Sequence, residues 1–324
     1  MNFLKTTLAN PVSAEPSSLQ LENGVNLELL ETGILRVSPA QQGDYRIVIS
    51  CGIHGNETAP IEMVEQLFSE INSGQLTVTN ELLLIIGNPP AANQAVRFVD
   101  ENLNRLFSGK HQSSSVQEAK RAKLIEDHVT EFYQQGDEPR LHYDLHTAIR
   151  GSELEKFAVY PYLHDRDWST TQIAFLERCG LEAILLSSKP SGTFSYFTST
   201  QFAADSFTVE LGRVRKFGDN DMSNFADAMQ GLRELISGQY HFSGDIKSIQ
   251  VFSVVEEVIK QSEALKLHIA EDAKNFTAFP KGSLLASDEG YEYRTQQDGE
   301  RFVFPISNIP IGQRAMLVVA PTIL

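Results

Sequence analysis

Cysteine is scarce in this chain: among 324 residues, only Cys51 and Cys179 are cysteines. Two isolated cysteines exclude a disulfide framework, and they cannot supply the thiolates that close most structural zinc sites. Long apolar runs are also missing, because no stretch approaches the roughly 20 apolar residues of a membrane span. The N-terminal segment "MNFLKTTLANPVSAEPSS" lacks the apolar core of a signal peptide. We therefore expect a cytoplasmic protein.

Positive charge is the second shortage. The chain has 27 Lys and Arg against 42 Asp and Glu, which gives a formal net charge of −15. This balance argues against a nucleic-acid partner and against binding to an anionic membrane surface. It does not argue against a small anionic ligand, since a few arginines inside a cleft can dominate the local field.

The order of strand-like and helix-like segments predicts the fold class. Up to about residue 243, buried apolar runs such as "YRIVISCGI" alternate with amphipathic helical segments such as "SSVQEAKRAKLIEDHVTEFYQQG". This alternation predicts an α/β domain with a mainly parallel or mixed sheet and helices on both faces. Beyond Ser243 only short strand candidates separated by turns remain. We expect one α/β domain over residues 1–243 and a smaller all-β domain over residues 244–324.

A possible metal site follows the first buried run, in the sequence His54-Gly55-Asn56-Glu57. In open α/β sheets, ligands bind at the carboxyl ends of the strands. Gly55 leaves room for a tight backbone path, and His54 and Glu57 could together chelate one zinc. The best third ligand is His146, which ends another apolar strand in "HYDLHTAIRG". Two histidines and one carboxylate with an open fourth position are typical of a catalytic zinc site.

Other interpretations of these histidines stay open. An isolated H-x-x-E is a weak motif, and a histidine at a strand end is often only hydrogen-bonded. If residues 142–146 were helical, His142 and His146 would form a rival ligand pair. The alternation around Tyr143 favours a strand, which puts His142, Asp144 and His146 on one face. Asp144 could then orient a ligand imidazole, or it could be an ordinary solvated or capping aspartate.

Glu210 in "SFTVELGRV" is the candidate catalytic base, because it ends a strand after three mostly apolar positions. A glutamate near a metal can take a proton from water and give it to a leaving nitrogen. The alternative is a carboxylate paired with Arg213 or another arginine. Ser195 could suggest a serine hydrolase, but no nucleophile elbow surrounds it.

Three polar residues, Arg97, Asn104 and Arg105, share the segment "NPPAANQAVRFVDENLNRLFSG", which leaves the carboxyl end of a predicted strand. Guanidinium forks suit carboxylate binding and oxyanion stabilisation. The alternative for each arginine is simple surface solvation. The shared position at a strand's carboxyl end favours a functional interpretation.

Taken together, four segments resemble the succinylglutamate desuccinylase/aspartoacylase family, a branch of the zinc carboxypeptidase-like superfamily. They are "HGNE" at 54–57, "NPPAANQAVRFVDENLNRLF" at 88–107, "DLHTA" at 144–148 and "VELG" at 209–212. The order and spacing fit, and the similarity extends through nearly the whole chain. In this family a C-terminal β domain often covers the active-site entrance, which would favour small substrates.

The resemblance also implies residue roles. It implies one zinc ion bound by His54, Glu57 and His146, with Glu210 as general base and acid. It further implies that Arg97 polarises the scissile carbonyl and that Asn104 and Arg105 hold a substrate carboxylate.

Within the family, "DLHTAIRGS" and "NFTAFPKG" are more similar to the desuccinylase branch. The aspartoacylase branch usually has Asn-Thr-Thr where this chain has Thr147-Ala148-Ile149. Arg150 is a candidate additional carboxylate contact, or else an exposed structural arginine. The expected activity is hydrolysis of N-succinylglutamate in arginine breakdown. An aspartoacylase-like deacylase of another N-acyl amino acid, a carboxypeptidase and a catalytically silent zinc-binding protein are the alternatives.

Overall fold

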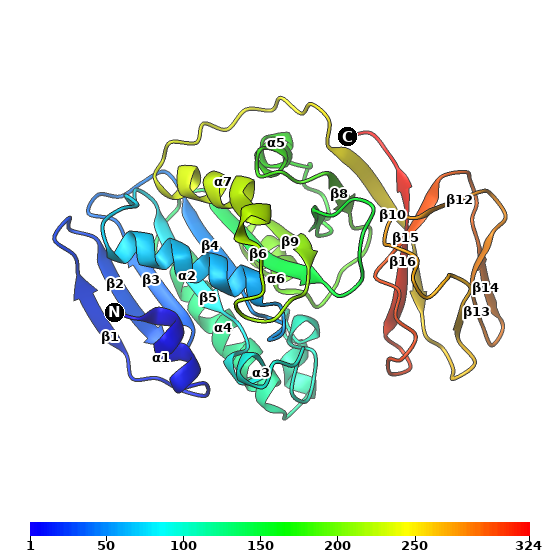
Figure 1. Cartoon of the computed structure of the whole chain (residues 1–324), viewed down its shortest axis with the longest axis horizontal. Helices are drawn as coiled ribbons and strands as arrows, with labels where there is room; N and C mark the ends of the chain where they lie inside the picture. Colours follow the sequence, from blue (N-terminus) through cyan, green and yellow to red (C-terminus); the bar gives the residue numbers. More distant parts are fainter.

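A 13-stranded sheet runs through the computed structural model, which describes residues 1–324 (Figure 1). In order across the sheet, its strands are β1 (Ser17–Gln20), β2 (Asn26–Glu31), β3 (Ile34–Ser38), β5 (Glu81–Ile86), β4 (Arg46–Cys51), β6 (Arg140–Ala148), β9 (Asp205–Arg213), β7 (Phe157–Tyr160), β8 (Ala183–Leu186), β10 (Gln250–Ile259), β16 (Arg314–Pro321), β15 (Glu300–Val303) and β12 (Ala278–Phe279). A separate sheet of three strands contains β11 (Lys266–Leu267), β13 (Leu284–Asp288) and β14 (Tyr291–Arg294).

The centre of the large sheet is parallel and covered on both faces. β5, β4, β6 and β9 are parallel neighbours. The helices are α1 (Phe3–Ala9), α2 (Thr58–Asn72), α3 (Pro89–Gln94), α4 (Gln117–Gln134), α5 (Thr170–Arg178), α6 (Phe194–Phe202) and α7 (Ala226–Ile236). In β4, Ile47 and Ile49 join the core under α2, α5 and α7, whereas Val48 joins the core under α4 and α6. The predicted α/β class with helices on both faces is confirmed.

The C-terminal part contains only strands, as predicted. Residues 237–249 form no helix or strand, and the predicted boundary at 243/244 falls within them. The large sheet nevertheless continues across this segment, because β10 pairs in parallel with β8 from Gln250↔Ala183 to Ser253↔Leu186. Side chains of both parts share one apolar core, which includes Phe157, Leu185, Phe252 and Val319.

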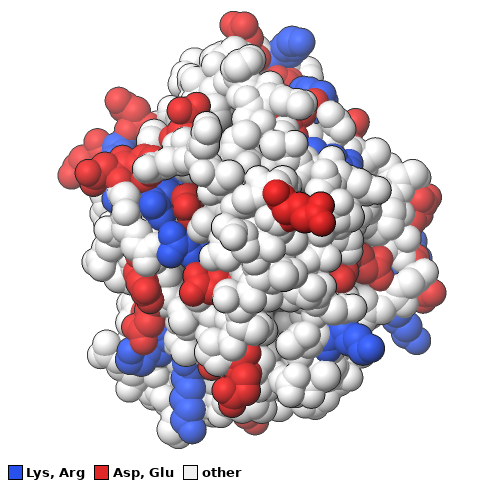
Figure 2. Space-filling model, turned by 90° about the vertical axis from the view of Figure 1, so that its left-hand side faces the viewer, with Lys and Arg blue, Asp and Glu red and all other residues white.

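The outer surface carries mixed charge. On the face at the left of Figure 1, Lys and Arg side chains are scattered among Asp and Glu without a continuous basic area (Figure 2). None of the helices combines the length and the apolar character that crossing a bilayer requires.

Candidate active site

The turn between β4 and α2 places His54 and Glu57 at the carboxyl edge of the sheet. Gly52 takes a left-handed φ of 61° after β4, and Glu57 is the N-cap of α2. Gly55 packs against the backbone of α3: a Cβ there would lie 2.2 Å from the carbonyl carbon of Ala91 and from the nitrogen of Ala92. The turn therefore requires glycine at this position, as expected.

The three predicted metal ligands converge in the structure. Nδ1 of His54 lies 2.8 Å from Oε1 of Glu57, and Nδ1 of His146 lies 2.8 Å from Oε2 of the same carboxylate. The two Nδ1 atoms are 3.2 Å apart, and all three side chains are buried. A tetrahedral ion with bonds of about 2.0–2.1 Å holds its ligand atoms roughly 3.3 Å apart. The buried triad fits a divalent metal ion.

The electrostatics of the triad favour a cation at its centre. Burial lowers the pKa of His54 to about 4, which leaves this imidazole neutral, the form that binds metal. Burial alone would raise the pKa of Glu57, but the two adjacent imidazoles hold it well below its usual value. For His146, the carboxylates of Asp144 and Glu57 outweigh burial and raise the pKa well above its usual value. These carboxylates thus stabilise positive charge where a metal would supply it.

Each ligand imidazole is oriented through its other ring nitrogen. Nε2 of His146 lies 2.9 Å from Oδ2 of Asp144, and Nε2 of His54 lies 3.0 Å from Oδ1 of Asn102. An Nε2–H bond to oxygen leaves the Nδ1 lone pair free for a metal. Asp144 thus occupies the orienting position considered from the sequence, whereas Asn102 was not anticipated.

β6 is a strand, so the helical pairing of His142 with His146 does not occur. His142, Asp144 and His146 do share one face, but His142 points away from the triad. Its Nε2 lies 2.9 Å from Oγ of Ser50, and Oγ of Ser50 donates to Oδ1 of Asp144 at 2.6 Å. His142 and Ser50 therefore support the aspartate that orients His146.

Glu210 lies beside His146, because these two residues are paired in the β6–β9 ladder. Its side chain is buried, and Oε2 has no hydrogen-bond partner in the protein. Burial raises the pKa of Glu210 to about 7, with Glu57 and Asp144 also raising it and His146 and Arg97 opposing. No ion pair joins Glu210 to Arg213, whose side chain is exposed. The carboxyl group is thus free to exchange a proton.

The segment after β5 brings Arg97, Asn104 and Arg105 to the same cavity. Nη1 of Arg97 donates to Oε1 of Glu57 at 2.7 Å. Asn104 lies in the short 3-10 helix η1 (Leu103–Arg105), where its Oδ1 accepts from the backbone nitrogen of Phe194 at 2.9 Å. Arg105 donates to the carbonyl oxygen of Asn104 at 2.8 Å.

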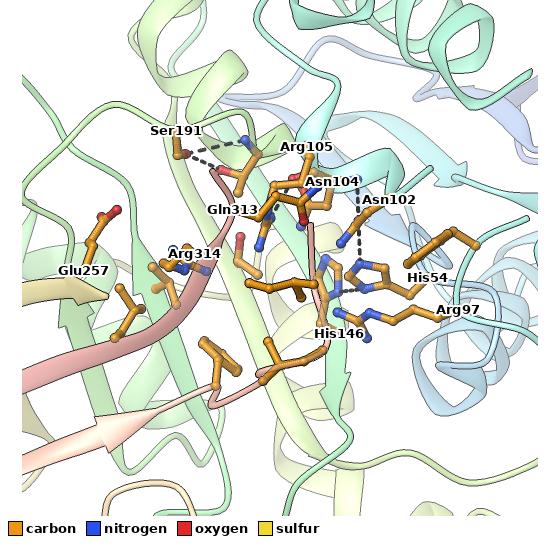
Figure 3. Close-up of a pocket in the computed structure, with 18 of the residues that line it drawn as sticks. His54, Arg97, Asn102, Asn104, Arg105, His146, Ser191, Glu257, Gln313 and Arg314 are labelled. Carbon is orange, nitrogen blue, oxygen red and sulfur yellow. Dashed lines mark hydrogen bonds between the residues drawn. The ribbon is translucent and has the colours of Figure 1, made fainter. Parts of the chain in front are cut away.

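The cavity beside the triad has a volume of about 540 Å³ and is lined from both parts of the chain (Figure 3). The strand-rich C-terminal part supplies several lining residues that the sequence did not single out, among them Glu257, Gln313, Arg314 and Leu317. Ser195 also lines the cavity, but its hydroxyl bonds to Thr208 at 2.8 Å and to no histidine. This arrangement does not build a serine nucleophile.

Arg150 lies outside the cavity. Its Nη1 donates to the carbonyl oxygens of Glu271 at 2.8 Å and of Ala273 at 2.7 Å. It is not among the residues that line the cavity. Arg150 therefore ties the end of β6 to the C-terminal part, in agreement with the structural alternative for this arginine.

Comparison with known families gives two matches along the chain. Residues 44–236 match the family model described as the succinylglutamate desuccinylase/aspartoacylase catalytic domain. Residues 247–322 match the model described as the AstE/AspA barrel-sandwich hybrid domain.

Individual relatives are similar over nearly their whole length. The succinylglutamate desuccinylase of Pseudoalteromonas atlantica is 49% identical over 317 residues, which cover 95% of this chain and 91% of the relative. The succinylglutamate desuccinylase of Idiomarina loihiensis is 45% identical, with 94% and 91% covered. The crystal structure of the succinylglutamate desuccinylase from Chromobacterium violaceum superposes with a TM-score of 0.90 at 39% identity, covering 100% of this chain and 98% of that one.

Proposed function

Because this chain belongs to the succinylglutamate desuccinylase/aspartoacylase family, we propose that it is a zinc-dependent hydrolase that cleaves the amide bond of N-succinyl-L-glutamate. The products would be succinate and L-glutamate. This reaction would be the last step in the breakdown of arginine through succinylated intermediates. One observation carries the proposal: the buried triad of His54, Glu57 and His146 lies beside a buried carboxyl group, Glu210, with an unpartnered oxygen.

Zinc is the metal that best suits this donor set. Two imidazoles and one carboxylate, with a further position for water or substrate, form the usual arrangement of zinc hydrolases. When bound, zinc would supply Lewis-acid chemistry: it polarises a carbonyl and lowers the pKa of water from about 15.7 toward 7.

Glu210 is the proposed general base and acid. A carboxylate at this position can take the proton of the attacking water and then deliver it to the departing amine nitrogen. Its pKa, raised to about 7 by burial, suits a group that must both accept and donate a proton near neutrality.

Arg97 and Asn104 are the proposed substrate-positioning groups near the reacting carbon. Arg97 uses one N–H group on Glu57, and its other N–H groups have no protein partner and can stabilise charge on the carbonyl oxygen. The Oδ1 atom of Asn104 is occupied by Phe194, so its NH2 group remains available to a substrate carboxylate.

A substrate panel with and without a chelator tests the proposed function. We expect purified protein to release glutamate from N-succinylglutamate faster than amino acid from N-acetylaspartate or N-succinylarginine. Chelation should abolish the activity and zinc should restore it. Faster turnover of another member of the panel would refute the substrate assignment. Full activity after complete metal removal would refute the mechanism.

We predict that Asp144→Asn weakens zinc binding by about 10- to 100-fold, because the amide orients His146 less strongly than a carboxylate does. Competition with a chromogenic chelator measures this affinity. The matched control is Asp127→Asn, since Asp127 lies in an exposed ion pair with Lys123. Zinc affinity within about twofold of the wild type would show that Asp144 does not act on the metal site.

A further inference from the structure

Arg314 lies at the start of β16 and lines the part of the cavity that the C-terminal strands supply. In the close-up, Arg314 and Glu257 lie on one side, and His54, His146 and Arg97 lie on the other (Figure 3). The backbone around Arg314 is held on both flanks. The carbonyl of Gln313 accepts from the nitrogen of Lys260 at 2.9 Å, and the carbonyl of Ala315 accepts from Ile306 at 2.8 Å. The guanidinium is thus presented from a fixed position.

This guanidinium forms no ion pair in the protein. No carboxylate oxygen lies within 4.0 Å of its nitrogens, the distance limit for an ion pair. Glu257 on the adjacent strand β10 lines the same cavity, and its charge raises the pKa of Arg314 against the effect of burial, which lowers it. Arg105 is in a similar situation, because its side chain donates only to the carbonyl oxygen of Asn104. A guanidinium fork suits the bidentate binding of a carboxylate. Two guanidinium groups that form no ion pair and line one cavity therefore point to an anionic ligand.

The two arginines also affect each other. Burial, together with the like charges of Arg314 and Arg97, lowers the pKa of Arg105 to about 9, although the Glu257 carboxylate opposes this shift. Like charges brought together where water is scarce repel each other, and a carboxylate that binds between them relieves this repulsion. The rest of the lining carries mixed charge: Arg97 and Lys189 are basic, and Asp100, Glu101, Glu210 and Glu257 are acidic.

We propose that Arg314, together with Arg105, forms a second carboxylate subsite, which binds a substrate carboxylate remote from the scissile amide. This inference rests on the proposed function. N-succinylglutamate has two such groups, the carboxylate of the succinyl moiety and the side-chain carboxylate of glutamate. Arg314 is then a specificity-determining residue supplied by the C-terminal part, and it favours acyl-amino acids with a remote carboxylate over those without one.

The test uses Arg314→Gln and Arg314→Lys with three substrates: N-succinylglutamate, N-succinylglutamine, and the analogue whose succinyl carboxylate is replaced by an amide. For Arg314→Gln we expect a KM for N-succinylglutamate roughly 10- to 100-fold higher, the effect of losing a charge-assisted hydrogen bond. Zinc content and Tm should stay unchanged, and kcat should change less than KM. Arg314→Lys should recover part of the loss, because it keeps the charge without the fork.

Each of the two analogues lacks one of the remote carboxylates. The analogue that lacks the carboxylate bound by Arg314 should be hydrolysed equally well by the wild type and by Arg314→Gln. This comparison identifies the group that Arg314 binds. The matched control is Arg294→Gln, an exposed arginine on β14 of the same part of the chain. The subsite would be overturned if Arg314→Gln had a KM for N-succinylglutamate within about twofold of the wild type. It would also be overturned if Arg314→Gln raised KM equally for all three substrates.

Equilibrium binding separates this inference from the proposed reaction. Calorimetry with succinate and with L-glutamate needs no turnover. We expect one of these dicarboxylates to bind the zinc-loaded wild type at least about tenfold more tightly than it binds Arg314→Gln. If the wild type hydrolyses none of the substrates but shows this difference, the proposed function fails and the subsite stands. If both ligands bind both proteins equally, the subsite is refuted whatever the activity.

Discussion

Glu210→Gln is expected to lower kcat by about 10²- to 10⁴-fold while the protein keeps its zinc, because an amide cannot exchange the proton that the reaction moves. The structure supports retention of the metal, since the triad of His54, Glu57 and His146 does not include Glu210. Steady-state kinetics with N-succinylglutamate, together with zinc analysis of the same sample, measures both quantities.

The control for this variant is Glu263→Gln, which changes a largely exposed glutamate paired with Lys260. Its kcat should equal that of the wild type. Thermal unfolding of both variants shows whether Glu210→Gln is folded. A folded, zinc-loaded Glu210→Gln with kcat within about tenfold of the wild type would assign the proton transfer to another group.

Glu57→Gln is expected to lose the metal itself. The Glu57 carboxylate contacts both ligand imidazoles at 2.8 Å and accepts from Arg97 at 2.7 Å and from the backbone of Thr147 at 3.1 Å. A glutamine has no negative charge for the ion and would direct an NH2 group at an imidazole or at Arg97. We expect zinc affinity to fall by more than about 100-fold, beyond the usual effect of an orienting residue.

Zinc content after dialysis and activity with added zinc measure this effect. Glu57→Gln should be inactive without metal, whereas Glu210→Gln should be nearly inactive with its metal in place. Retention of one zinc per chain in Glu57→Gln would remove Glu57 from the ligand set. The two variants thus separate metal binding from proton transfer.

The sequence was sufficient to predict the convergence of His54, Glu57 and His146. β4, with the sequence "RIVISC", is buried at every position, and such mostly apolar runs are typical of strands covered on both faces. In a parallel sheet the carboxyl ends of neighbouring strands share one edge, so residues that end β4 and β6 must lie close together. Local sequence patterns, together with the rule that parallel strands end at one edge of a sheet, were enough to predict this convergence.

Other parts of the site depend on long-range geometry that local patterns do not encode. Asn102 reaches His54 because of the path that the chain takes between β5 and α4, and no motif marks it. Arg314 and Glu257 reach the cavity only because β10 pairs with β8, a contact between segments far apart in sequence. Arg150 was a candidate ligand for substrate, but the approach of residues 271–273 gives it carbonyl partners instead.

Helix α6 is an element that local sequence patterns do not predict. Its sequence "FSYFTSTQF" is rich in aromatic and hydroxyl-bearing residues, which have modest helix propensity. Tertiary contacts compensate: the hydroxyl of Thr193 caps the helix, and Asn104 accepts from its first backbone nitrogen. The site thus helps to build the helix that packs behind it.

The parallel pairing of β8 with β10 means that the two parts of this chain cannot be exchanged like independent modules. A protein truncated after residue 243 would leave the apolar strand β8 as an open edge, and such edges promote aggregation. During evolution, the residues that the C-terminal strands contribute to the cavity would therefore change more easily by substitution than by exchange of the whole domain.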